Sequence, residues 1–91
     1  MAQLTIKHPH NLSLNELKPQ VDELAKSLRE KYGASTHWQG DNVITVKAKG
    51  VDGTLTLEEK HLQVNIKLGM MTSFLKPQIE AEIRTYLAAK V

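Results

Sequence analysis

The chain has 91 residues, no cysteine, and twelve Lys and Arg against ten Asp and Glu, so its net charge is only +2. This length suits one small domain, residues 1–91, which needs most of its hydrophobic residues, 41% of the total, for its core. The lack of cysteine excludes disulfides, thiol catalysis and thiolate metal sites, and the mixed charges argue against a nucleic-acid binder. The start of the chain shows no signal-peptide pattern, and no apolar run approaches the roughly 18 residues of a membrane span. We therefore expect a cytoplasmic protein without a membrane span.

The N-terminal third predicts a strand followed by a long helix. Residues 4–8 alternate apolar and polar side chains, and a proline stops the strand. Ser13 and Glu16 have the spacing of a capping box, and Gly33 suits the left-handed residue that ends a helix. Pro19 predicts either a kink or a helix whose regular part begins near it. The apolar residues between these ends fall on one stripe of the helix, which we expect to be buried: Leu14, Leu17, Val21, Leu24, Ala25, Leu28 and Tyr32.

The middle of the chain has the two-residue period of an antiparallel meander. Four strands fit this period, over residues 35–39, 43–49, 54–58 and 61–68. Turns are expected at Gly40-Asp41-Asn42, at Gly50-Val51-Asp52-Gly53 and at Glu59-Lys60. Only one face of the resulting sheet is apolar, so the opposite face is expected to be solvated.

The C-terminal segment predicts a second helix. Gly69 breaks the last strand, and Thr72 or Ser73 is expected to cap a helix that runs nearly to the end of the chain. Glu80 and Arg84 form a favourable pair at four-residue spacing. The stripe of this helix is Leu75, Ile79, Ile83, Tyr86 and Leu87.

The element order β-α-β-β-β-β-α predicts an α+β fold, in which a five-stranded antiparallel sheet carries two helices on its apolar face. This order resembles the TATA-box-binding-protein-like fold, which helix-grip lipid and polyketide binders share in elaborated form. Fold alone does not decide function.

No catalytic or metal-binding constellation stands out. The candidate imidazole ligands are His8, His10, His37 and His61. Their spacing does not by itself supply the three or four ligands of a zinc site, and their role stays open. The sequence has no nucleophile elbow and no phosphate-binding loop before a helix, and Asp41 and Asp52 fall in separate predicted turns. We therefore expect a non-enzymatic protein without a cofactor or a metal.

Two apolar features are candidates for binding. The single tryptophan, Trp38, lies in a predicted strand, and the densest apolar stretch joins the last strand to the final helix. Methionine and phenylalanine suit an adaptable contact surface. The alternative, which the small size of the core favours, is that all of these residues are buried. The candidates are Trp38, Met70, Met71, Phe74 and Leu75.

Four short motifs extend over nearly the whole chain: His10-Asn11-Leu12, Trp38-Gln39-Gly40-Asp41, Gly50-Val51-Asp52-Gly53 and Leu68-Gly69-Met70-Met71. In their order and spacing they resemble the polyhydroxyalkanoic acid system protein family. Pro19 and Val46, which stands where an aromatic residue is frequent, depart from that pattern. The resemblance implies a small bacterial protein of the cytoplasm, associated with polyhydroxyalkanoate synthesis and use or with the granule surface. It implies no enzymatic activity and no ligand residues.

Three functions remain as hypotheses. The first is an accessory protein that binds a polyhydroxyalkanoate granule, or a granule protein, through the candidate apolar residues; the same patch would equally serve as a homodimer contact. The second is a carrier or sensor that holds an acyl or other hydrophobic molecule in a cavity between the sheet and the C-terminal helix. The third is DNA contact through the polar sheet face, against which the near-neutral charge argues. That face would carry Thr45, Lys47, Gln63, Asn65 and Lys67.

Overall fold

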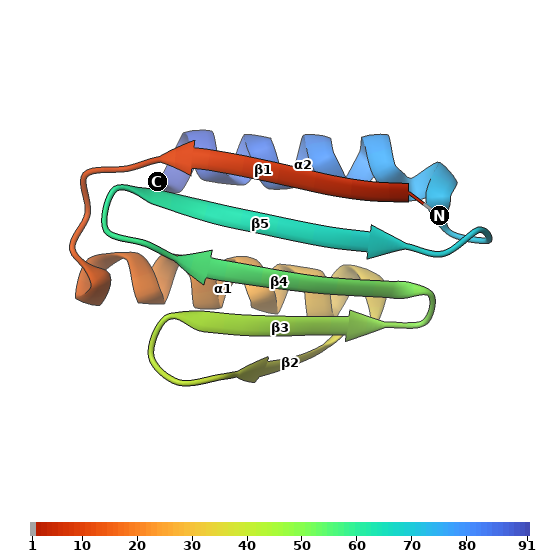
Figure 1. Cartoon of the computed structure of the whole chain (residues 1–91), viewed down its shortest axis with the longest axis horizontal. Helices are drawn as coiled ribbons and strands as arrows, with labels where there is room; N and C mark the ends of the chain where they lie inside the picture. Colours follow the sequence, from red (N-terminus) through yellow and green to blue (C-terminus); the bar gives the residue numbers. More distant parts are fainter. Residues whose placement is uncertain (1) are drawn as a thin grey trace.

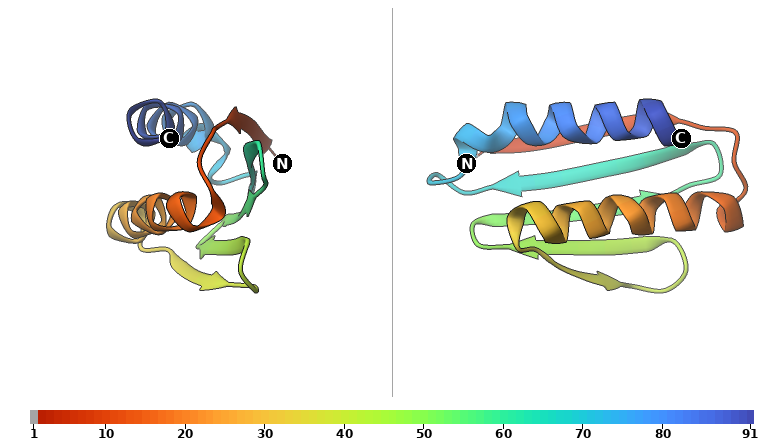
Figure 2. Two further views of the ribbon diagram at one scale, coloured as in Figure 1. Left: turned by 90° about the vertical axis from the view of Figure 1, so that its left-hand side faces the viewer. Right: turned by 180° about the vertical axis from the view of Figure 1, so that it is seen from behind.

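The computed structural model describes residues 2–91 as a five-stranded antiparallel sheet with two helices packed side by side on one of its faces (Figures 1 and 2). The strands are β1 (Ala2–Pro9), β2 (Ser35–Trp38), β3 (Val43–Ala48), β4 (Val51–Leu57) and β5 (His61–Leu68), in the spatial order β1-β5-β4-β3-β2. Helix α1 (Leu14–Tyr32) follows β1, while the short 3-10 helix η1 (Ser73–Leu75) and helix α2 (Lys76–Lys90) follow β5. The fold class and element order expected from the sequence are confirmed.

Helix α1 begins and ends as its sequence predicts. The Ser13 hydroxyl accepts from the Glu16 N–H at 3.2 Å, and the Glu16 carboxylate accepts from the Ser13 N–H at 3.1 Å. The bond from the Ser13 backbone lowers the pKa of the Glu16 carboxyl. Gly33, with φ 65°, ends the helix. Pro19 lies inside α1, so the alternative in which the regular helix begins near Pro19 is wrong.

The core lies between the sheet and the two helices. Alternate residues of the strands point toward the helices, and α1 and α2 each turn one apolar stripe toward the sheet. Leu14 is an exception to the expected stripe, because 42% of it is exposed. The buried apolar residues are Leu4, Ile6, Leu17, Val21, Leu24, Ala25, Leu28, Ala34, Ile44, Val46, Leu55, Leu57, Leu62, Val64, Ile66, Leu68, Ile79, Ile83 and Leu87.

The turn between β3 and β4 is shorter than the sequence predicts. Val51 pairs with Ala48, so that Lys49 and Gly50 alone form the turn, and Gly50 has φ 76°. The expectation that residues 51–53 also belong to this turn is wrong, because all three are part of β4. Asp52 therefore lies in a strand and not in a turn.

The start of α2 also differs from its prediction. Thr72 directly precedes η1, and Ser73 is the first residue of η1. Helix α2 begins only at Lys76, without a side-chain cap. Both hydroxyls donate to loop carbonyls instead, that of Thr72 to the oxygen of Gly50 and that of Ser73 to the oxygen of Met70. The predicted pair between Glu80 and Arg84 is confirmed at 2.9 Å. Within residues 2–91, no helix is long and apolar enough to cross a membrane.

Candidate binding surface

The loop between β5 and α2 presents three large apolar side chains to solvent. Met70, Met71 and Phe74 are 82%, 86% and 74% exposed. The alternative favoured by the sequence, that this stretch is core, is therefore wrong for these three residues. Leu75 is only partly buried and packs against the core. An isolated exposed leucine is ordinary, but three large apolar residues in one loop are typical of a contact surface.

Hydrogen bonds hold this loop against the β3–β4 turn. The carbonyl oxygen of Gly50 accepts from the Gly69 N–H at 3.0 Å and from the Thr72 hydroxyl at 2.6 Å. The Ser73 hydroxyl donates to the Met70 carbonyl at 3.2 Å. A Cβ at Gly50 would lie 2.8 Å from the Thr72 methyl carbon, so only glycine permits this close approach. The exposed side chains thus project from an ordered backbone.

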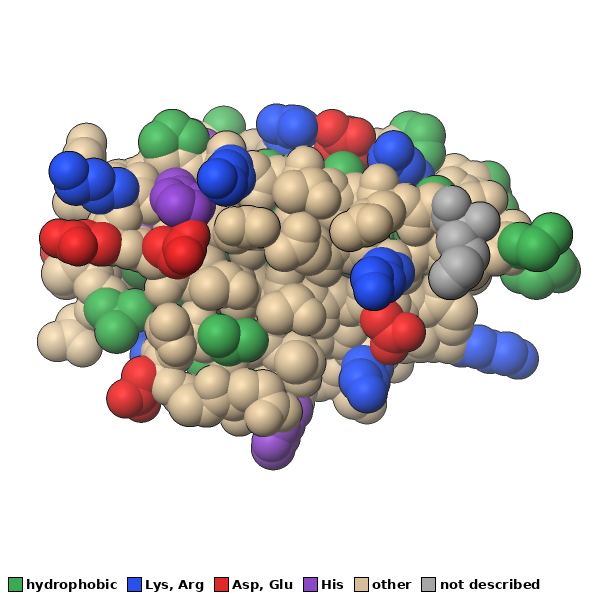
Figure 3. All heavy atoms as spheres, viewed as in Figure 1, with side chains coloured by type: hydrophobic (Ala, Val, Ile, Leu, Met, Phe, Trp, Pro, Cys, Tyr) green, Lys and Arg blue, Asp and Glu red, His purple; other side chains and the backbone are tan. Residues whose placement is uncertain are grey.

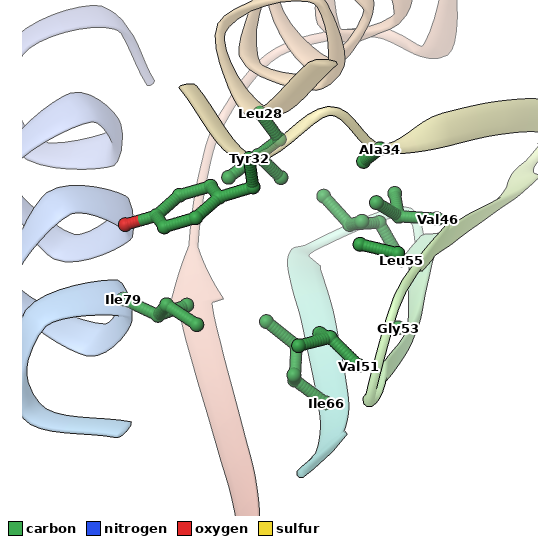
Figure 4. A pocket seen from close by; sticks show the side chains of 10 residues that line it. Leu28, Tyr32, Ala34, Val46, Val51, Gly53, Leu55, Ile66 and Ile79 are labelled. Carbon is green, nitrogen blue, oxygen red and sulfur yellow. The ribbon is translucent and has the colours of Figure 1, made fainter. Parts of the chain in front are cut away.

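An apolar pocket of about 30 Å³ lies between the end of α1, the start of α2 and the inner face of the sheet (Figure 4). Its walls come from large aliphatic side chains, but Ala34, Ala48 and Gly53 also line it. These three small residues leave space that larger residues would fill. A Cβ at Gly53, for example, would already lie 3.4 Å from a side-chain carbon of Ile66.

The residual exposure of the core shows that this pocket opens to solvent. Ala34, Leu28 and Val46, which all line it, have the highest exposed fractions among the buried apolar residues, at 9%, 6% and 6%. Leu17 and Leu62, toward the other end of the sheet, are both at 0%. The core is therefore sealed at one end and open at the other.

Tyr32 forms one wall of the pocket and points its hydroxyl toward α2 (Figure 4). That hydroxyl donates to the Glu82 carboxylate at 3.1 Å, which links the end of α1 to the middle of α2. Burial, together with the nearby Glu82 carboxylate, raises the pKa of the Tyr32 hydroxyl. Since the hydroxyl is occupied outside the pocket, the pocket itself offers no polar side chain.

The pocket is lined from the end of α1, the residues on either side of the β3–β4 turn and the start of α2. In Figure 1 these segments lie toward the right, at the same end of the sheet as the loop that follows β5. Ala48 and Val51 line the pocket and flank the turn, and the carbonyl of Gly50 within that turn holds the loop. We refer to this pocket together with Met70, Met71 and Phe74 as the apolar end.

Trp38 is not part of the apolar end. Its indole N–H donates to the Asp22 carboxylate at 3.4 Å, and the Lys18 ammonium lies 5.0 Å from the ring centroid. Trp38 pairs with Ile44 near the start of β3, whereas the loop is held beyond the end of that strand. The structure thus separates the two candidate features, and Trp38 attaches the edge strand β2 to α1.

The opposite end of the sheet is closed by a buried histidine. His10 is 7% exposed, its Nδ1 accepts from the Leu12 N–H at 3.1 Å, and its Nε2 lies 2.7 Å from the Glu58 carbonyl oxygen. The neutral ring satisfies both contacts with its proton on Nε2. The backbone N–H of His10 also donates to the Lys60 carbonyl at 3.0 Å. The histidine whose role the sequence left open therefore joins the β1–α1 loop to the β4–β5 turn, and we call this region the histidine end.

The other histidines do not assemble with His10 into a metal site. His61, on β5, pairs with the Glu58 carboxylate, and His37 lies on the distant edge strand β2. Across residues 2–91, the structure contains no group of three or more His, Asp or Glu side chains arranged to hold a metal ion.

The outer face of the sheet is polar but carries little net charge. Cross-strand neighbours place Asp52 between Lys47 and Lys67, while Thr54 lies between Thr45 and Asn65. In Figure 3 most of this face is tan, the colour of uncharged polar side chains and backbone, and the charged groups are scattered over it. The face therefore lacks the dense basic patch of a nucleic-acid interface.

Comparisons with known proteins agree with the motifs. A family model described as "Putative polyhydroxyalkanoic acid system protein" matches residues 4–91. A search of curated proteins and a search of solved structures each found no match. Two of the motifs meet at the apolar end, where Gly50 accepts the bond from Gly69. The match covers nearly the whole chain and confirms the resemblance: the chain belongs to the polyhydroxyalkanoic acid system protein family.

Proposed function

We propose that this protein is a non-enzymatic accessory protein of polyhydroxyalkanoate metabolism that binds the granule surface through its apolar end. The observation that carries the proposal is the exposure of Met70, Met71 and Phe74 on a loop fixed by hydrogen bonds. Membership of the family supports a partner within the polyhydroxyalkanoate system, because the family model describes a polyhydroxyalkanoic acid system protein.

Burial of these side chains favours binding. Each Met or Phe that leaves water contributes roughly 1.5–3 kcal/mol, so that three of them contribute roughly 4.5–9 kcal/mol. This gain stands against the roughly 4–15 kcal/mol that association costs in lost motional freedom. Because the Gly50 and Thr72 bonds already order the loop, little further ordering is needed on binding.

The test is co-sedimentation of the purified protein with native granules and with washed, protein-free polymer. Met71→Asp and Phe74→Asp should each lower binding about tenfold or more, because a charge would have to leave water. Leu14→Asp is the matched control: it also replaces an exposed apolar residue, but at the first position of α1, where an acidic side chain suits the helix. Salt up to about 1 M, where the Debye length is roughly 3 Å, should leave the binding in place. Absence of sedimentation with both preparations would remove the proposal.

A homodimer contact is the competing use of the same patch. Sedimentation velocity distinguishes it, because Met71→Asp would then convert a dimer into a monomer.

The carrier hypothesis has a specific observation in its favour, the apolar pocket, but the size of the pocket opposes it. Its volume of about 30 Å³ is far below the roughly 300–1,000 Å³ of small-molecule sites. An acyl chain would enter only if α1 and α2 moved apart. Titration with a medium-chain fatty acid, followed by Trp38 fluorescence and calorimetry, tests this hypothesis directly.

A further inference from the structure

We infer that the pocket at the apolar end takes a short alkyl group, the methyl or ethyl side group of a polyhydroxyalkanoate repeat unit, while Met70, Met71 and Phe74 cover the polymer around it. This inference rests on the proposed function and adds a specific subsite to it. It also predicts which polymers the protein prefers.

The size of the pocket sets the size of the group. A cavity needs about 10–15 Å³ to hold one group the size of a water molecule. The pocket, at about 30 Å³, therefore admits two groups of that size. A methyl or ethyl group fits this space, whereas a pentyl group does not. The limit comes from Leu28, Val46 and Ile79, which are almost fully buried and form the pocket's fixed walls.

The lining of the pocket favours a polyester over a protein segment. The backbone of a peptide would lie over the opening and on Met70, Met71 and Phe74, whose side chains offer its N–H donors no good acceptor, and each donor that is buried without a partner costs free energy. The pocket offers no acceptor side chain, because the only polar group on a lining residue, the Tyr32 hydroxyl, is engaged with Glu82. A polyhydroxyalkanoate chain has no hydrogen-bond donors along its backbone, and its alkyl side groups make only apolar contacts.

The position of the pocket links it to the exposed loop. Ala48 and Val51 are half-buried at its rim and pair with each other directly beside Gly50, whose carbonyl binds Thr72. A polymer chain that lies on Met70 and Met71 therefore passes close to the opening of the pocket. Side groups occur at every repeat unit, so one of them is always available where the chain crosses the rim.

The experiment compares binding to two polymers, and it uses a variant in which a larger side chain fills the pocket. The wild-type protein should sediment with protein-free polyester bearing methyl side groups more strongly than with polyester bearing pentyl side groups. Ala48→Leu places additional carbon atoms in the pocket and should lower affinity for the methyl polymer about fivefold, the effect of losing one to two CH₂-sized contacts. Ala48→Gly is the matched control, because it changes the same position without adding carbon atoms or a polar group to the pocket, and it should retain the preference. Circular dichroism and the thermal midpoint establish that each variant is folded.

Each remaining outcome counts against the inference. If Met71→Asp abolishes binding but Ala48→Leu binds the methyl polymer as the wild type does, the pocket is not used although the proposed function holds. Binding to native granules but not to bare polymer identifies a granule protein as the partner, which overturns the inference alone. Stronger binding to the pentyl polymer overturns the size argument. Should Ala48→Leu fail to fold, Ala34→Val fills the same pocket from the segment before β2 and serves as the second variant.

Discussion

The two ends of the sheet differ in how the hydrophobic core is separated from solvent. At the histidine end, buried polar bonds from His10 to Leu12 and Glu58 close the core, and the apolar residues beneath are fully buried. At the apolar end, Leu28, Ala34 and Val46 keep exposed fractions of 6%, 9% and 6%, and the neighbouring loop turns Met71 and Phe74 outward. The difference teaches that buried polar bonds close one end of this small domain, whereas the other end leaves apolar side chains exposed.

Side-chain size along the inner face of the sheet explains this asymmetry. Toward the histidine end, Leu57 pairs with Leu62 across β4 and β5. Toward the apolar end, Ala48 pairs with Val51, and Gly53 pairs with Val46. The smaller side chains line the pocket that lies between the sheet and the helices at this end.

The largest effect on stability should follow from truncation of the core at the histidine end. Leu62→Ala should cost about 2–5 kcal/mol, because Leu62 is at 0% exposure and its surroundings relax only partly. Val51→Ala, at the half-buried rim of the pocket, should cost no more than about 1 kcal/mol, since much less area is lost. Urea unfolding followed by circular dichroism measures both values. Equal losses would show that the two ends are packed alike.

Loss of the buried histidine should have the next largest effect. His10→Ala leaves the Leu12 N–H and the Glu58 carbonyl without their partners and should lower the free energy of unfolding by about 2 kcal/mol. His37→Ala, which removes an exposed histidine from β2, is the control and should change it by less than about 0.5 kcal/mol. If the two variants are equally stable, His10 does not close its end of the sheet.

The third prediction separates contact from backbone strain at the apolar end. Gly50 and Gly40 have φ 76° and 82°, so alanine at either position is strained by about 1–2 kcal/mol. Only at Gly50 would the new Cβ also meet Thr72, at 2.8 Å, while at Gly40 nothing lies within 4 Å. Gly50→Ala should therefore be the less stable variant and should release the loop, seen as faster hydrogen exchange of the Gly69 amide. Identical exchange in both variants would mean that the turn does not hold the loop.

The fold could be read from the sequence because its signals are local. The capping residues Ser13 and Glu16, the alternation within β5 and the spacing of Glu80 and Arg84 all act within a few residues of one another. The predicted start of α2 was wrong because the Thr72 hydroxyl does not cap the helix. It bonds to the carbonyl of Gly50, which is 22 residues away in the sequence. No local pattern encodes that choice between a cap and a distant carbonyl.

For the same reason, the residues of the candidate surface could be predicted from the sequence but their exposure could not. Met70, Met71 and Phe74 were identified by their apolar character, but loop residues have no period that would tell which face they take. One signal did point outward for Met70 and Met71, since they lie between Gly69 and the expected helix cap at Thr72 or Ser73, outside any regular stripe. The pocket carried no sequence signal, because Ala34, Ala48 and Gly53 come from separate segments and share only their small size.

The smallest effect at neutral pH concerns Tyr86, which joins the two helices away from the pocket. Its hydroxyl donates to the Gln20 carbonyl at 3.1 Å and to the Glu23 carboxylate at 3.3 Å, and burial followed by the charge of Glu23 raises its pKa to about 12. The folded state thus favours the neutral phenol, so this contribution is complete below the ordinary tyrosine pKa of about 10 and is lost as pH rises toward 12. Tyr86→Phe should cost about 1 kcal/mol at pH 7 and should flatten the fall in stability above pH 10. Urea unfolding at a series of pH values from 7 to 11.5 measures this. A wild-type profile that is already flat would show that the contacts of the Tyr86 hydroxyl with α1 do not stabilise the folded state.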